Sequence, residues 1–208
     1  MKKLINAISF LILINIIKLF SGCGPCDCNI APGTFDFTQI KTENINNAGR
    51  WHSITESDTL KAAAVAFKIS VSGNDTLLSA YHISSFGFSQ ACAFECYCPI
   101  PFKPNQLIED ISIKTIYDLS DDMPAGSDIT NFFVGYTDNY SNTSDKLYLS
   151  IDEILNKINP DMLYDTQTVS FQVYLKKEIT VQKAQFLFSI TLSDGRVLSD
   201  TTSLITIE

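Results

Sequence analysis

Residues 186–197, Phe-Leu-Phe-Ser-Ile-Thr-Leu-Ser-Asp-Gly-Arg-Val, contain the clearest fold signal in the chain. Apolar residues stand at 186, 188, 190 and 192, with Ser189 and Thr191 between them. A period of two is typical of a strand that buries one face. Asp194-Gly195 follows and favours a tight turn, because glycine adopts the backbone conformation that such a turn needs. We therefore predict a β-hairpin whose second arm runs from Arg196 to the end of the chain.

Similar alternation occurs along most of the remaining chain. It predicts strands over residues 35–40, 65–71, 77–84, 107–117, 131–136, 146–149 and 169–175. A helix is predicted over 151–158, where Ser150 and Glu153 have the spacing of a capping box and Asn159-Pro160 ends the helix. Seven to nine strands with one short helix indicate an all-β fold, an antiparallel β-sandwich of the immunoglobulin-like or a related type.

The first 22 residues have the pattern of a bacterial lipoprotein signal peptide. Lys2 and Lys3 give a positive start, residues 4–17 are mostly apolar, and Ser21-Gly22 stand directly before Cys23. Lys18 interrupts the apolar run, which is then too short to span a membrane. This predicts a lipid on Cys23; an ordinary secretory signal, with Cys23 in a disulfide, is the alternative.

The mature chain divides into a tail and one domain. We expect residues 23–34 to form a lipid-attached tail with a Cys-x-Cys motif, and residues 35–208 to form a single β-sandwich domain. The expected location is the bacterial cell envelope, with the lipid anchoring the protein to the outer membrane. Since Asp27 is the sole acid just after the anchor, a periplasmic and a surface-exposed orientation both stay open.

Five cysteines follow Cys23 in two clusters. They are Cys26 and Cys28 near the anchor, and Cys92, Cys96 and Cys98 further on. Export places them in an oxidising compartment, which favours disulfides, and a bond between the clusters would pin the tail to the domain. A zinc or copper site is the alternative, although the spacing differs from that of common zinc sites. The pairing cannot be read from the sequence.

The charge balance narrows the range of partners. The chain has 15 basic and 23 acidic residues, and removing residues 1–22 takes away three lysines and no acids, which leaves a net charge of −11. Nucleic acid is excluded as a partner, because binding it requires clustered lysine and arginine. Attraction to anionic lipid headgroups is disfavoured for the same reason, so the lipid itself is expected to hold the protein at the membrane.

No catalytic motif is found in the sequence. There is no Gly-x-Ser-x-Gly, no His-Glu-x-x-His and no phosphate-binding glycine loop, and His52 and His82 are isolated. We therefore expect a non-enzymatic binding or structural module without a cofactor, which binds a partner protein or a glycan. Candidate binding aromatics are Phe132, Phe133, Tyr136 and Tyr140. A secreted β-sandwich hydrolase or carbohydrate-active protein that uses paired acids such as Asp121 and Asp122 is the alternative.

The segment 118–128 is unusually acidic. Its carboxylates, Asp118, Asp121, Asp122 and Asp128, are candidate calcium ligands because calcium prefers oxygen ligands. The spacing does not match an EF-hand loop, and a solvated loop between strands is the favoured interpretation.

The same region carries a family resemblance. Tyr117-Asp118, the segment Met123–Ile129 and Phe132-Phe133, together with the start Pro25–Cys28, resemble a family of uncharacterised Bacteroidota lipoproteins. The resemblance covers nearly the whole mature chain and implies an envelope address and an all-β domain, without an activity. Asp-Thr pairs also resemble O-glycosylation sites of exported Bacteroidota proteins, which makes Thr59, Thr76 and Thr201 candidate acceptors.

Overall fold

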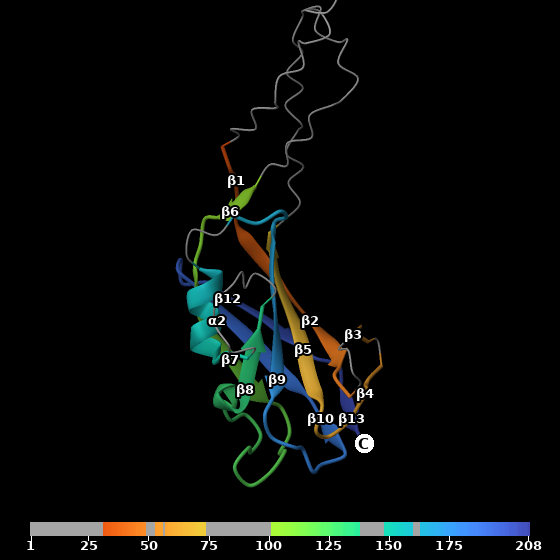
Figure 1. Ribbon diagram of the computed structural model, residues 1–208. Coiled ribbons are helices and arrows are strands. Elements are labelled where there is room, and N and C mark those ends of the chain that lie inside the picture. The colour runs from red at the N-terminus through yellow and green to blue at the C-terminus, as the bar shows by residue number, and fades with distance from the viewer. Residues whose placement is uncertain (1–30, 49–52, 56, 74–100, 138–147, 160–162) are drawn as a thin grey trace, which may run out of the picture. The chain divides into compact units, whose positions relative to one another are not determined.

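The computed structural model describes residues 31–48, 53–55, 57–73, 101–137, 148–159 and 163–208 (Figure 1). Apart from Ala31, these residues belong to one compact unit. The strands in this part of the chain are β1 Gly33–Phe35, β2 Phe37–Asn46, β3 Ser53–Ile54, β4 Thr59–Leu60, β5 Val65–Gly73, β6 Phe102–Pro104, β7 Ile108–Thr115, β8 Phe133–Tyr136, β9 Thr168–Leu175, β10 Lys183–Ala184, β11 Phe186–Leu192, β12 Val197–Thr201 and β13 Ile205–Ile207. The helices described are a short 3-10 turn, η1 Thr130–Phe132, and an α-helix, α2 Ile151–Ile158.

The largest sheet has five strands in the order β3-β2-β5-β9-β8, and every neighbouring pair is antiparallel. Figure 1 shows β2, β5 and β9 running side by side through the middle of this sheet. In β5 alternate side chains point to opposite faces of the sheet. Phe67 and Ile69 are fully buried on one face, whereas Lys68 is half-buried on the other. The sheet therefore has one face in the core and one face that is more exposed.

A second, three-stranded antiparallel sheet has the order β12-β11-β7 and shares the core with the first. The Phe67 ring of β5 lies 5.2 Å, centroid to centroid, from the rings of both Phe186 and Phe188 of β11. These edge-to-face contacts join the two sheets through fully buried aromatic side chains.

Helix α2 contacts β7 and β8 and contributes to the same core. The Ser150 hydroxyl accepts a hydrogen bond from the Glu153 amide, and the Glu153 carboxylate accepts one from the Ser150 amide, which confirms the predicted capping box. On β8, Gly135 lies so close to Ile154 that a Cβ at this position would come within 2.5 Å of the isoleucine Cγ1. Glycine is thus required where the helix meets the sheet.

The predicted hairpin is confirmed at its turn but not in its second arm. Strands β11 and β12 pair antiparallel, and Gly195 has a φ of 83° in the turn between them. The second arm ends at Thr201. At the next residue, the buried Thr202, the side-chain hydroxyl accepts the hydrogen bond from the Phe186 amide in place of a backbone carbonyl, and the strand pairing stops there. Residues 205–207 then form β13 in a different sheet.

The expectation of a purely antiparallel fold is also corrected. Strand β1 pairs parallel with β6, and β13 pairs parallel with β4, while its other neighbour β10 is antiparallel. More strands form than the seven to nine predicted, because four short strands, β3, β4, β6 and β10, form where none was predicted and two expected segments divide. The segment 35–40, for example, divides at Asp36 between β1 and β2. The predicted strand over 77–84 lies outside the described residues. The result is a mostly β protein with several antiparallel sheets.

Candidate binding site

A β-bulge decides which side chains reach the exposed face of the five-stranded sheet. The pairing of β2 with β5 shifts between Phe37 and Gln39, which inserts one extra residue into β2. Phe37 is buried in the core, yet Ile45, eight residues on, pairs with Ala66 on the opposite face of the sheet. Without the extra residue, Phe37 and Ile45 would share one face. The bulge therefore brings Glu43 and Ile45 out beside Lys68.

Two cross-strand rows cover this face. A polar row runs from β8 to β2 and contains Tyr136, Gln172, Lys68 and Glu43, each opposite the next. The next row is apolar and contains Val134, Tyr174, Ala66, Ile45 and Ile54. Tyr174, Ala66 and Ile45 are buried in a small cluster separate from the main core. A polar and an apolar strip thus lie side by side on one sheet face.

A cavity of about 240 Å³ is lined by residues of both rows. The side chains that matter for its chemistry are Ile45, Ile54, Lys68, Tyr136, Ser170 and Gln172. Aliphatic, aromatic, hydroxyl, amide and ammonium groups are all present, but none of the described residues lining the cavity is acidic. The volume lies just below the range of about 300–1,000 Å³ of drug-sized pockets. It is suited to one ring or a group of similar size.

Lys68 and Gln172 are the polar groups best placed to bind a ligand. The Lys68 ammonium group makes no hydrogen bond or ion pair with any described residue. Glu43 stands opposite it on β2, but the Glu43 carboxylate is bound by Lys41 Nζ at 2.8 Å, a contact that raises the pKa of Lys41. The Tyr174 hydroxyl donates to Gln172 Oε1, so the Gln172 amide hydrogens point elsewhere. The cavity therefore presents hydrogen-bond donors on its polar side.

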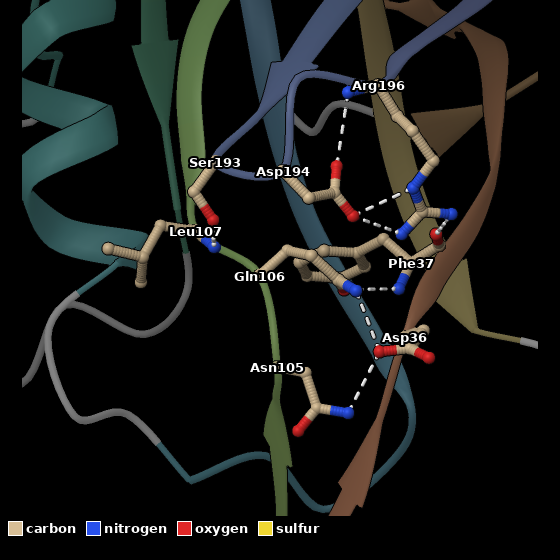
Figure 2. A network of polar contacts seen from close by, with 8 residues as sticks. All are labelled: Asp36, Phe37, Asn105, Gln106, Leu107, Ser193, Asp194 and Arg196. Carbon is tan, nitrogen blue, oxygen red and sulfur yellow. Dashed lines mark hydrogen bonds and ion pairs between the residues drawn. The ribbon is translucent and has the colours of Figure 1, made fainter.

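A separate polar network lies at the junction of β1 with β2 (Figure 2). Asp36 Oδ1 accepts hydrogen bonds from Asn105 Nδ2 at 2.8 Å and from Gln106 Nε2 at 2.7 Å. These two bonds lower the pKa of Asp36. Gln106, which is buried, uses its other amide atom to accept the Phe37 amide hydrogen at 3.0 Å. The network holds the residue that stands just before the bulge.

The turn between β11 and β12 completes this network (Figure 2). Arg196 donates from Nη1 to the Phe37 carbonyl at 3.0 Å, and its Nε and Nη2 bind Asp194 Oδ2, both at 2.8 Å. Ser193 and Leu107 exchange two hydrogen bonds beside it, at 2.9 and 3.0 Å. Because the polar groups bind each other and the backbone, we interpret the network as a structural clasp. We use the name clasp for Asp36, Asn105, Gln106, Asp194 and Arg196.

The predicted calcium ligands are spread over different local contacts. Asp118 accepts the Ala125 amide at 2.7 Å, and Asp128 accepts the Ser112 hydroxyl at 2.8 Å and the Thr130 amide at 2.9 Å. Within the described residues, no group of three or more histidine, cysteine, aspartate or glutamate residues could hold a metal ion. The segment 118–128 is thus built from turns stabilised by its own carboxylates.

Asp122 has a different partner from a distant part of the chain. Its carboxylate pairs with Lys177 and also accepts the Ser120 hydroxyl at 2.7 Å. These contacts, that of Lys177 above all, lower the pKa of Asp122 to about 2. Its neighbour Asp121 is exposed. Lys177 also lies 5.6 Å from the centre of the Phe132 ring. The ion pair therefore ties the acidic segment to the loop after β9.

Three of the four aromatics predicted to bind a partner are described, and of these only Tyr136 lines the cavity. Phe133 is 2% exposed in the core, and Phe132 is half-buried and packs against it. Tyr140 lies outside the described residues, as do the six cysteines, both histidines and Thr76. The other two predicted glycosylation acceptors, Thr59 on β4 and Thr201 on β12, are exposed. Sequence reasoning missed Lys68, Gln172 and Ile45, which carried no motif.

Within the described part of the chain, no helix combines the length and apolar character that crossing a membrane requires.

Comparison with known proteins places the chain in a family without assigning an activity. No curated protein is significantly similar to the chain. A family model described as a domain of unknown function, DUF5034, matches residues 37–203, from the start of β2 to just beyond β12. Since this match spans most of the sequence, the protein belongs to the DUF5034 family.

Proposed function

We propose that this protein is a lipid-anchored lipoprotein of the bacterial cell envelope whose β domain is a non-enzymatic binding module. We further propose that the two facing sheets form a sandwich related to the immunoglobulin type, and that the cavity on the outer sheet face takes a saccharide. The cavity is the observation that carries the proposal. Its Tyr136, Gln172 and Ser170 offer an aromatic face, an amide and a hydroxyl, the groups that bind a polyhydroxylated ring.

The chemistry of the cavity favours binding over hydrolysis. A glycosidase needs two carboxyl groups roughly 5–10 Å apart across the scissile bond. The described residues lining the cavity include no acid, and the Asp122 of the predicted acid pair is bound to Lys177 and Ser120. A binding role asks only for shape, hydrogen bonds and apolar contact, which these residues supply.

Saccharide binding is tested by probing a printed glycan array with the purified protein. We expect binding to at least one oligosaccharide and a loss of at least tenfold in affinity for Tyr136→Ala. Tyr117→Ala is the matched control, because Tyr117 is an exposed tyrosine that does not line the cavity. An array without signal, or equal binding by wild type and Tyr136→Ala, would refute this function.

The anchor is tested separately by metabolic labelling with a radioactive fatty acid in the bacterial host. The wild type should be labelled and Cys23→Ala should not, because Cys23 is the proposed lipid acceptor. With Cys23 lipidated, five cysteines remain, so thiol counting on the denatured, unreduced protein should find one free thiol. Equal labelling of both proteins would end the lipoprotein proposal, and four or five free thiols would favour a metal site over disulfides.

A further inference from the structure

Among the described residues that line the cavity, Lys68 is the sole charged one. Its side chain is half-buried on β5, and no described residue pairs with its ammonium group. Acids outnumber bases by 23 to 15 in this chain, so a shortage of carboxylates does not explain a lysine without an acidic partner among the described residues. An ammonium withdrawn in part from water gains most from a bound anion.

The neighbours of Lys68 have partners of their own and leave its ammonium group available to a ligand. Glu43, directly opposite on β2, is occupied by Lys41, so two lysines face one glutamate along these two strands. On the other side of Lys68 stands Gln172, whose Oε1 accepts the Tyr174 hydroxyl. Its amide hydrogens are therefore the groups that remain for a ligand. A carboxylate has two oxygens that can accept from the Lys68 ammonium and the Gln172 amide together.

The remaining walls set the shape of what carries the carboxylate. Tyr136 stands next to Gln172 at the β8 side, and Ile45 and Ile54 form the apolar side. Ser170 adds a hydroxyl next to Gln172 along β9. A pyranose ring that carries one carboxylate and several hydroxyls, with an apolar C–H face to pack on Tyr136, would match these groups.

We propose that the cavity binds the carboxylate-bearing ring of an acidic saccharide, a uronic or sialic acid residue. The carboxylate binds Lys68 and the Gln172 amide, and the ring lies against Tyr136. This inference rests on the proposed saccharide-binding function and adds the charge of the ligand to it.

The test is a glycan array on which uronate- and sialate-bearing oligosaccharides are printed beside their carboxylate methyl esters. Each ester has the same sugar rings but no negative charge. We expect at least one acid to bind tenfold or more tightly than its ester, and this preference should weaken as the NaCl concentration rises. Lys68→Met, which keeps a long side chain on the sheet, should abolish the preference. Lys183→Met is the control, because Lys183 on β10 is exposed and lies outside the cavity.

Two further variants keep the result interpretable. Lys68→Arg should retain the preference for the acid, since it restores a cation at the same position. Lys68→Gln serves where Lys68→Met folds poorly, and thermal unfolding of each variant reports on the fold. Equal binding of acids and esters, lost in Tyr136→Ala, would overturn this inference and leave the proposed function standing. A preference that survives Lys68→Met or Lys68→Gln would also overturn it, whereas no binding to any saccharide would overturn both proposals.

Discussion

Replacing Gln106 by methionine should destabilise the fold more than any other change in the clasp (Figure 2). Gln106 is a buried polar residue that accepts the Phe37 amide and donates to Asp36. Methionine has a similar length and fills the same space, but it offers neither bond. The Phe37 amide, which belongs to a residue that is 1% exposed, then loses its partner.

The magnitude follows from that orphaned amide. A buried donor left without an acceptor costs about 1–3 kcal/mol, so we expect Gln106→Met to lower the free energy of unfolding by about 2 kcal/mol. With a urea m-value of about 2 kcal/mol/M, this moves the unfolding midpoint down by about 1 M.

The assay is urea unfolding followed by tyrosine and tryptophan fluorescence, with Asn105→Ala as the matched control. Asn105 donates to the same oxygen of Asp36, but its side chain is exposed and accepts nothing from a buried amide. Asn105→Ala should change the free energy of unfolding by no more than about 0.5 kcal/mol, as is usual for surface positions.

A third variant, Gln106→Glu, separates hydrogen bonding from packing. The introduced carboxylate can still accept the Phe37 amide, but it faces Asp36 across a contact that measures 2.7 Å in the wild type. Repulsion from the Asp36 carboxylate raises the pKa of the introduced carboxyl group. The loss in the free energy of unfolding should therefore be largest near neutral pH and shrink as the introduced group becomes protonated. Equal midpoints for wild type and Gln106→Met, or a Gln106→Glu penalty that does not change with pH, would refute this reasoning.

Three further outcomes are expected. Lys177→Met should move the pKa of Asp122, measured by NMR titration, from about 2 back toward 3.8, because the hydrogen bond from Lys177 is the main cause of the lowered pKa. Any stability that this pair adds in the wild type is present above pH 3.8 and is lost as the pH falls toward 2. Gly195→Ala should cost about 1–2 kcal/mol in thermal unfolding, because φ is 83° there, and Gly195→Asn should recover part of it; equal costs for both would show that the backbone is not the cause. Ser150→Ala should cost about 1 kcal/mol through loss of the bond from the Glu153 amide, and an unchanged melting temperature would show that the cap adds nothing.

The parts of the fold that depend on local signals were predictable from the sequence. The turn at Asp194-Gly195 and the helix capped by Ser150 each depend on residues within a few positions of one another. The alternation over residues 65–71 predicted a strand with one buried face, and in β5 Phe67 and Ile69 are fully buried. Such signals act before distant segments meet, so the sequence shows them directly.

Pairing between distant segments was not predictable. Whether β13 lies parallel to β4 depends on contacts between residues about 150 positions apart, such as the Thr206 amide on the Asp58 carbonyl at 2.6 Å. The end of β12 similarly depends on Thr202 and the Phe186 amide. No pattern within either segment encodes the choice of partner.

Ile45 of the candidate binding site was missed because one inserted residue reverses the side-chain alternation of β2. A strict period of two from Phe37 places Ile45 in the core, whereas the bulge turns Ile45 outward into the cavity wall and directs Thr42 toward Ile69 instead. The cost of the reversal is visible at Thr42, whose buried hydroxyl has no partner among the described residues. A bulge has no sequence signature of its own in this segment.

The clasp gives a physical reason why the chain keeps this bulge. Gln106 and Arg196 bind the amide and the carbonyl of Phe37, the last residue before the register shifts, and so fix its backbone from both sides. Successive side chains of a strand point to opposite faces of the sheet, so the position of Phe37 determines the face on which each later side chain of β2 lies. The hydrogen bonds that stabilise one end of β2 therefore also determine that Glu43 and Ile45 stand beside Lys68 at the other. Stability and the candidate binding surface are thus coupled through the register of a single strand.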